Sequence, residues 1–341
     1  MVDVFFATNR RPNQEDNPTD FGKDFSADGL SSLRFGHAAV TGKNLDHYSL
    51  TLAPEQIVPD PARTMTDLEK STFGSVETFQ RVRKKMAKHS RDTVIFIHGY
   101  NVSFSQALTD AARLKEKLRR ESGGVNMVLF SWPSDGSMAP ILAYANDRQD
   151  AAASGAAFAR GFLKLADFLG GALPEEDCKE SIHLIAHSMG NYVLRGAVQE
   201  ISRQHPGRPP RLFDQVFLMA PDEDDNAFEK EHKLLPLPRL AKRVNVYFNN
   251  EDLAMSISDK TKGQPDRLGA DGPRLPRSVP GKVTLIDCTP VVSGIVEHSY
   301  YLETDRVAED MRQVLTGIAS DEIDGRTYII ETNRYRLKKT A

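Results

Sequence analysis

The stretch I-A-H-S-M-G-N, residues 185–191, decides the fold of this chain. An apolar run precedes it and a helix-like pattern follows it up to Gln204, so Ser188 lies in a sharp turn from a strand into a helix. Small residues flank this serine, Ala186 before it and Gly190 after it, because such a turn brings two backbone segments very close together. The pattern is that of a nucleophile elbow with alanine in place of the first glycine. It presents the serine hydroxyl at the carboxyl edge of a sheet.

Strand and helix patterns alternate on both sides of this turn. Continuous apolar runs predict buried strands over 93–97, 125–130, 182–186, 216–219, 244–248 and 283–287. Helices are expected between them, the longest in an alanine-rich stretch over 139–169. This alternation predicts an α/β fold with a mostly parallel central sheet and helices on both faces.

The pattern divides the chain into three parts. Residues 92–320 carry the alternation and form the predicted catalytic core. Residues 1–91 contain strand-like segments and are expected to pack on that core as an extension, whereas the basic tail over 321–341 has no predicted place. Within the core, residues 256–281 are rich in proline and glycine, which predicts a covering loop near the mouth of the active site.

Composition excludes several classes of protein. The 341 residues carry 44 Lys and Arg against 47 Asp and Glu, a net charge of −3 that gives no general attraction to nucleic acid or to an anionic membrane. The sequence contains no run of about 18 apolar residues, so no membrane span is predicted. The start of the chain lacks a basic segment before an apolar stretch, and the two cysteines suit reduced thiols, so a cytoplasmic location is expected. The oligomeric state is not indicated.

A histidine must accept the serine proton, because a neutral hydroxyl is a weak nucleophile. Among nine histidines, His298 is preferred because it follows the last predicted strand of the core. His187 lies in the elbow itself, and its side chain is expected to point away from the site that Ser188 faces. His183 lies within a strand and is interpreted as a core residue. His98 is expected to bond the backbone of its own loop.

An acid must orient that histidine. Asp252 follows the predicted strand over 244–248 and lies between the nucleophile and the base in the chain, which is the order typical of this arrangement. It is therefore the preferred acid. Three other carboxylates stay open as alternatives: Glu251, Asp222 and Asp224.

Two backbone amides must stabilise the negative charge that develops on a carbonyl oxygen under attack. The Met189 amide is one candidate, because it directly follows the nucleophile at the start of a helix. The Tyr100 amide is the other, in a loop where Gly99 lets the backbone approach closely. Nucleotide-binding and metal-binding signatures are missing, so neither a cofactor nor a metal is expected. The acidic cluster over 222–225 lacks the ligand spacing of a calcium loop.

Together these motifs resemble an α/β-hydrolase and, more closely, the bacterial family DUF900. The shared segments are V-F-F-A-T-N-R at 4–10, F-I-H-G-Y-N at 96–101, F-S-W-P-S at 130–134, A-H-S-M-G-N at 186–191, A-P-D-x-D at 220–224 and H-S-Y-Y at 298–301. The resemblance extends from Val4 to about Leu315 and implies a hydrolase fold with esterase activity.

The sequence therefore predicts a serine hydrolase that cleaves small carboxylic esters through an acyl-enzyme, with Ser188, His298 and Asp252 as its catalytic residues. An amidase, thioesterase or lactonase that uses the same residues is one alternative. A binding protein without catalysis on the same fold is another.

Overall fold

The computed structural model describes residues 1–15, 17–53, 74–121, 123–134, 140–170, 178–252, 266–292 and 298–339. Eleven strands form one central sheet. They are β1 (Val2–Thr8), β4 (Arg34–Thr41), β5 (His47–Leu52), β6 (Thr93–Ile97), β7 (Asn126–Ser131), β8 (Ile182–His187), β9 (Phe213–Met219), β10 (Ala241–Phe248), β11 (Val283–Asp287), β12 (Arg326–Ile329) and β13 (Arg334–Leu337). A separate hairpin joins β2 (Arg10–Pro12) to β3 (Phe21–Phe25).

The described helices lie outside this sheet. They are α2 (Gly74–His89), α3 (Phe104–Lys117), α4 (Pro140–Gly170), α5 (Gly190–Gln204), α7 (Leu268–Asp271), α8 (Tyr300–Glu303) and α9 (Asp305–Val314), with short 3₁₀ turns at Leu237–Arg239, Pro276–Ser278 and Ile330–Thr332. None of these helices is both long and apolar enough to cross a membrane.

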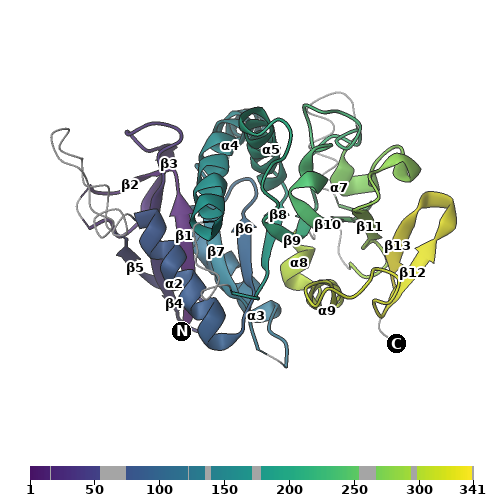
Figure 1. Cartoon of the computed structure of the whole chain (residues 1–341), viewed down its shortest axis with the longest axis horizontal. Coiled ribbons are helices and arrows are strands. Elements are labelled where there is room, and N and C mark those ends of the chain that lie inside the picture. The colour runs from purple at the N-terminus through teal and green to yellow at the C-terminus, as the bar shows by residue number, and fades with distance from the viewer. Residues whose placement is uncertain are drawn as a thin grey trace.

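The strands follow the order β12-β13-β11-β10-β9-β8-β6-β7-β1-β4-β5 across the sheet (Figure 1). Neighbours from β1 through β11 pair in parallel, and antiparallel pairs occur only at the two ends of the described sheet. Every residue of β8 is buried, as a strand covered by helices on both faces must be. The predicted α/β class with a mostly parallel sheet is confirmed.

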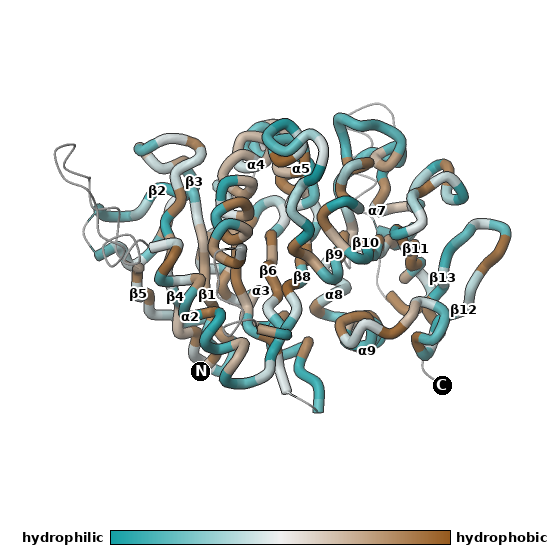
Figure 2. The backbone as a smooth tube through the Cα atoms, viewed as in Figure 1, coloured by the Kyte–Doolittle hydropathy of each residue, from teal (hydrophilic) through white to brown (hydrophobic). Residues whose placement is uncertain are grey.

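Two hydrophobic clusters cover the two faces of the sheet. One contains apolar residues of α2, α4 and α5, and the other contains those of α3, α8 and α9. Figure 2 shows hydrophobic residues along the central strands and hydrophilic ones on the outer parts of the helices and loops. The sheet therefore lies between two helical layers. The loops that follow its parallel strands, at its carboxyl edge, carry the residues predicted to be catalytic.

Both chain ends continue the sheet. From residues 1–91, β1 pairs with β7, and β4 and β5 follow it outward. In the tail, β13 pairs with β11 and β12 forms the edge. The guanidinium of Arg326 donates two hydrogen bonds of 2.7 Å to the buried Asp310 of α9, which fixes the terminal hairpin to the core.

A close crossing of α4 and α5 holds the helical layer over the elbow. A Cβ added at Gly155 of α4 would lie 2.7 Å from backbone atoms of Gly196 on α5. Neither backbone can shift without moving its whole helix, so glycine is required at this crossing.

Gly155→Ala is therefore expected to destabilise the protein by about 1–3 kcal/mol through overpacking, although alanine favours helix formation. Urea unfolding measures this change. Gly170→Ala at the exposed end of the same helix is the matched control, because no heavy atom lies within 4 Å of its added Cβ. A control variant within about 0.5 kcal/mol of the parent is expected. Equal effects of the two variants would contradict the close crossing.

Candidate active site

Ser188 lies in a strained turn between β8 and α5. Its backbone φ is 50°, in the left-handed region that costs a residue with a Cβ about 1–3 kcal/mol. Surrounding hydrogen bonds hold it there: its amide donates to the Met219 carbonyl at 2.9 Å, and its carbonyl accepts from the Asp222 amide at 3.2 Å. The turn is thereby fixed to the end of β9, the neighbouring strand.

Two glycines lie where this turn touches the loop that follows β6. A Cβ at Gly99 would lie 2.9 Å from the Cβ of Ser188, and one at Gly190 would lie 2.7 Å from the carbonyl oxygen of Ile97. Real Cβ atoms do not approach neighbours so closely. The elbow and the loop can therefore meet only because both positions lack a side chain.

His298 and Asp252 meet at the same edge of the sheet. The Nδ1 atom of His298 lies 2.7 Å from Oδ2 of Asp252, although 46 residues separate them in the chain. The Asp252 side chain is fully buried, whereas the His298 side chain keeps 21% of its exposure. Because the carboxylate accepts a hydrogen bond from the Nδ1 proton, the neutral ring has Nε2 as its acceptor nitrogen.

The other carboxylates considered have different partners. Asp222 accepts a hydrogen bond from the Tyr144 hydroxyl and lies 3.5 Å from Nε of Arg267. Asp224 pairs with Lys233 and with the same arginine, and Glu251 is exposed. The structure thus brings Asp252, rather than these three, to Nδ1 of His298.

His187 packs directly against His298, so the expectation that its side chain points away from the site is wrong. The two ring centroids lie 4.8 Å apart, and Nε2 of His187 lies 3.2 Å from the His298 carbonyl oxygen. The reason is that His298 reaches the site from the side of the sheet that carries α8, where His187 also contacts Tyr301. Burial, reinforced by the neighbouring His298, lowers the pKa of His187 well below its usual value, so this ring stays neutral.

His98 fixes the loop that faces the elbow. Its Nδ1 donates to the Gly99 carbonyl at 2.9 Å, its Nε2 accepts from the Trp132 amide at 3.2 Å, and its ring stacks on the Trp132 indole. Burial, helped by the charge of Arg10, lowers the pKa of His98 to about 3. His98 is thus a neutral residue whose two nitrogens are both engaged by backbone groups. His183 is also fully buried, and its Nδ1 accepts from the Gln215 amide.

Arg10 and Asp147 support this loop, and sequence reasoning gave neither of them a role. The Arg10 guanidinium donates to the Ser131 hydroxyl at 2.9 Å and to the Val102 carbonyl at 2.7 Å. Asp147 accepts from the Ser134 hydroxyl at 2.5 Å and lies 3.4 Å from the Asn101 amide nitrogen. Arg10 lies in the segment 4–10 and Ser134, the partner of Asp147, lies in the segment 130–134. Both segments belong to the family resemblance, which is the sequence feature that could have pointed to these residues.

The two amides predicted to bind an oxyanion belong to the segments that meet. Met189 is fully buried at the start of α5, and its amide donates to no backbone carbonyl within the described ranges. Tyr100 directly follows Gly99, and its ring contacts that of Tyr144 on α4. Chain adjacency therefore places both residues beside Ser188.

The predicted covering loop is described only in part, since residues 256–265 lie outside the described ranges. The part from residue 266 onward begins as a packed segment: Leu268 to Ala270 are buried, and the Gly269 amide donates to the Pro221 carbonyl at 3.0 Å. This segment therefore lies against the residues that follow β9, next to the elbow. Among the described residues, no three His, Cys, Asp or Glu side chains gather closely enough to hold a metal.

Comparison with known proteins relates this chain to a protein family and to a cyanobacterial protein. A family model described as "Alpha/beta hydrolase of unknown function (DUF900)" matches residues 75–317. An uncharacterized protein of Nostoc sp., alr1448, is 23% identical over 384 aligned residues, which cover 92% of this chain and 93% of that protein.

The low pKa of His98 predicts a specific dependence of stability on pH. In the unfolded chain its pKa returns to about 6.5, so the stability gained from the neutral ring is complete above that pH and declines as pH falls toward 3. Between about pH 6 and pH 4 this residue should contribute about 1.4 kcal/mol per pH unit to the slope of unfolding free energy. Urea unfolding of His98→Asn should show a shallower slope than the parent. Equal slopes would mean that His98 is not held neutral.

Proposed function

The chain belongs to the DUF900 family of alpha/beta hydrolases of unknown function, and on that premise we propose that it is a serine hydrolase that cleaves carboxylic esters. The observation that carries the proposal is the 2.7 Å contact between His298 Nδ1 and Asp252, formed at the sheet edge that also carries the strained turn of Ser188. A buried carboxylate on Nδ1 holds the histidine in the tautomer that a general base needs.

In the first half of the proposed reaction, Oγ of Ser188 attacks the ester carbonyl carbon and its proton passes to Nε2 of His298. The carboxylate of Asp252 stabilises the imidazolium that forms. The carbonyl oxygen becomes negative, and the amides of Met189 and Tyr100 donate to it. Collapse of this intermediate breaks the bond to the alcohol oxygen, which takes the proton from His298, and leaves the acyl group on Ser188.

In the second half, water attacks the acyl carbon while His298 takes one of its protons. The bond to Oγ of Ser188 breaks, the serine recovers its proton from His298, and the carboxylic acid leaves. No oxidant, metal or further cofactor is needed to balance either half.

His187 supports this cycle through its neutral state. A positive charge 4.8 Å from the His298 ring would oppose formation of the imidazolium, and burial prevents that charge. The hydrogen bond from Nε2 of His187 to the His298 carbonyl also fixes the backbone of the base.

Turnover of p-nitrophenyl butyrate by Ser188→Ala tests the proposal. Removal of the nucleophile should lower kcat by up to about 10⁶. The far-ultraviolet circular dichroism spectrum should not change, since the substitution removes only the hydroxyl oxygen and keeps the Cβ of Ser188. Near-parental turnover by the folded variant would eliminate the serine mechanism. Matched p-nitroanilide and thioester substrates would reveal an amidase or a thioesterase, and failure of all three with the parent protein would favour a binding protein.

Asp252→Asn should lower kcat by about 10² to 10⁴ because His298 loses the charge that holds its tautomer. The neighbouring exposed residue supplies the control: Glu251→Gln should retain activity near that of the parent. Steady-state kinetics on the same ester gives both values. A nearly silent Asp252→Asn together with a crippled Asp222→Asn would move the acid to the loop after β9.

A further inference from the structure

The segment over residues 266–269 lies between two loops at the carboxyl edge of the sheet. On one side, the Gly269 amide donates to the Pro221 carbonyl at 3.0 Å, and on the other side the Gly269 carbonyl accepts from the Asn249 amide at 3.1 Å. The contact is close, because a Cβ on this glycine would lie 2.7 Å from the carbonyl carbon of Ala220. The segment therefore joins the loop that follows β9 to the loop that follows β10.

Each of these two loops is bonded to a candidate catalytic residue or contains one. In the loop after β9, the Asp222 amide donates to the Ser188 carbonyl at 3.2 Å. In the loop after β10, the Asp252 amide donates to the Asn249 carbonyl at 3.2 Å. A shift of one loop against the other would therefore move the proposed nucleophile relative to the proposed acid.

Arg267 brings a positive charge into this segment. Its Nη1 donates to Oδ1 of Asp224 at 2.9 Å, and its Nε lies 3.5 Å from Oδ1 of Asp222. The backbones of Arg267 and Asp224 also form a β-bridge. The guanidinium thus reaches two carboxylates of the loop after β9, and one of them belongs to the residue whose amide holds the Ser188 carbonyl.

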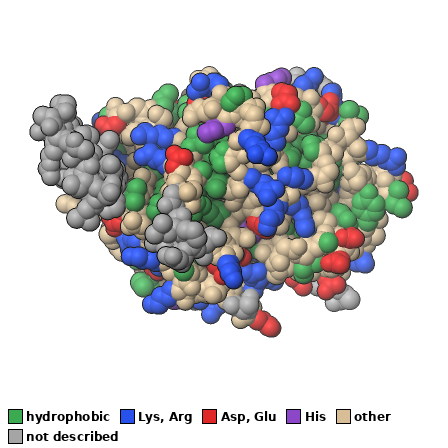
Figure 3. Space-filling view, in the orientation of Figure 1, with side chains coloured by type: hydrophobic (Ala, Val, Ile, Leu, Met, Phe, Trp, Pro, Cys, Tyr) green, Lys and Arg blue, Asp and Glu red, His purple; other side chains and the backbone are tan. Residues whose placement is uncertain are grey.

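Burial makes these charges different from those on the surface. Figure 3 shows Lys, Arg, Asp and Glu side chains over the viewed face, where water weakens the attraction between them. The side chains of Arg267 and Asp222 are only 1% and 2% exposed, so water screens their attraction far less. Removal of the guanidinium would leave the carboxylate buried without this cation, which favours a movement of the loop toward water.

We propose that Arg267 is a positioning residue that holds the loop after β9, and with it the Ser188 turn, in register with the loop that carries Asp252. The role rests on the proposed ester hydrolysis. Because Arg267 is buried, it acts through Asp222 on the nucleophile and through the Gly269 backbone on the acid loop, and it does not touch the reacting atoms.

Steady-state kinetics of Arg267→Gln on p-nitrophenyl butyrate tests this role. A misplacement of about 1 Å at the reacting groups can cost about 10² in rate, so kcat should fall by about 10- to 100-fold. KM should stay close to that of the parent, because the buried side chain does not contact the substrate. Arg267→Lys keeps the charge but offers one nitrogen where the guanidinium uses two, so it should lose less kcat than Arg267→Gln.

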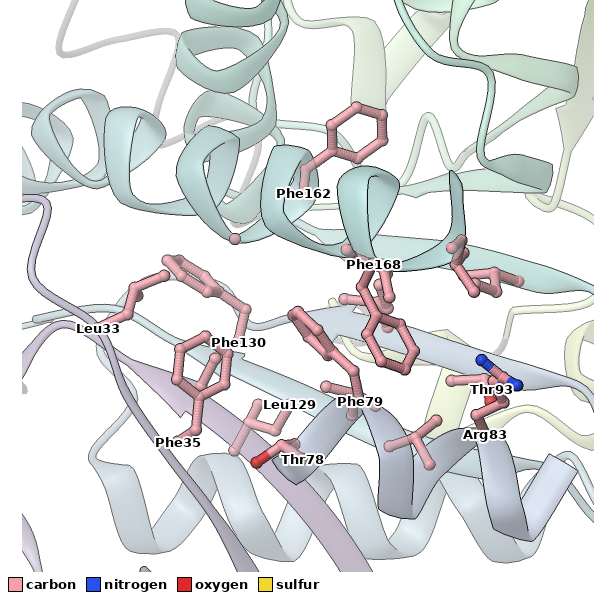
Figure 4. Close-up of a pocket in the computed structure, with 18 of the residues that line it drawn as sticks. Leu33, Phe35, Thr78, Phe79, Arg83, Thr93, Leu129, Phe130, Phe162 and Phe168 are labelled. Carbon is pink, nitrogen blue, oxygen red and sulfur yellow. The ribbon is translucent and has the colours of Figure 1, made fainter. Parts of the chain in front are cut away.

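Two control variants separate positioning from a general loss of stability. Arg326→Gln removes an equally buried arginine from Asp310, on strand β12, which four strands separate from β8. Phe162→Leu enlarges an apolar cavity of about 70 Å³ between α2, α4 and the sheet (Figure 4), whose lining includes Thr93 and Ile182 at the starts of β6 and β8. Both controls should lower the urea concentration at the midpoint of unfolding and leave kcat near that of the parent.

Hydrogen–deuterium exchange gives a readout that does not depend on turnover. In Arg267→Gln, the peptides that cover residues 219–225 and 247–252 should exchange faster than in the parent, because both loops lose a fixed neighbour. Arg326→Gln should leave the exchange of these two peptides unchanged.

The positioning role is overturned if Arg267→Gln keeps the kcat of the parent, if it loses no more activity than a control with an equal loss of stability, or if the two peptides exchange as in the parent. If Arg267→Gln does not fold, the same comparisons with Arg267→Lys decide. A parent protein that neither turns over esters nor reacts with a fluorophosphonate would instead overturn the proposed hydrolase, and the exchange data would still report whether Arg267 holds the two loops.

Discussion

Two backbone segments touch at the carboxyl edge of the sheet, with no space between them for a side-chain carbon. One is the turn at Ser188 and the other is the loop at Gly99, and a Cβ on that glycine would lie 2.9 Å from the Cβ of the serine. At this contact the serine backbone has a φ of 50°, which its hydrogen bonds with the Met219 carbonyl and the Asp222 amide hold in place. It also brings an amide-bearing loop beside the serine, which an oxyanion site requires. The strained backbone of this turn costs free energy of folding, and the packing of the surrounding residues offsets that cost.

Several buried residues support the contact between the Ser188 turn and the Gly99 loop. His98 and Trp132 stack behind the loop, and Arg10, from the first ten residues, ties the loop to the end of β7. Burial keeps both His98 and His187 neutral. His298 is partly exposed and its Nδ1 lies against the buried Asp252, which is why it is the histidine of this group that we propose as the general base.

Features that depend on neighbouring residues in the chain were predicted correctly from the sequence. Periodicity and strand-to-helix order predicted the parallel sheet, and the spacing of small residues around Ser188 predicted the turn. Chain order favoured Asp252 but allowed Asp222, because both follow strands that end at the same edge. Their different partners depend on which loops lie side by side, and local pattern does not report that. The same limit explains why the position of the His187 side chain was predicted wrongly, since the sequence does not show that His298 lies on the same side of the sheet. It also explains why the tail had no predicted place, since the tail is fixed by the pairing of Arg326 with the distant Asp310.

We propose that the strained turn presents an activated serine. Reaction of the folded protein with a fluorophosphonate, followed by intact mass measurement and peptide mapping, tests it most directly. We expect a single phosphonyl adduct on the peptide that contains Ser188, and much slower labelling of His298→Ala. A folded protein that gains no adduct, or that carries it on another serine, would show that Ser188 is not the nucleophile.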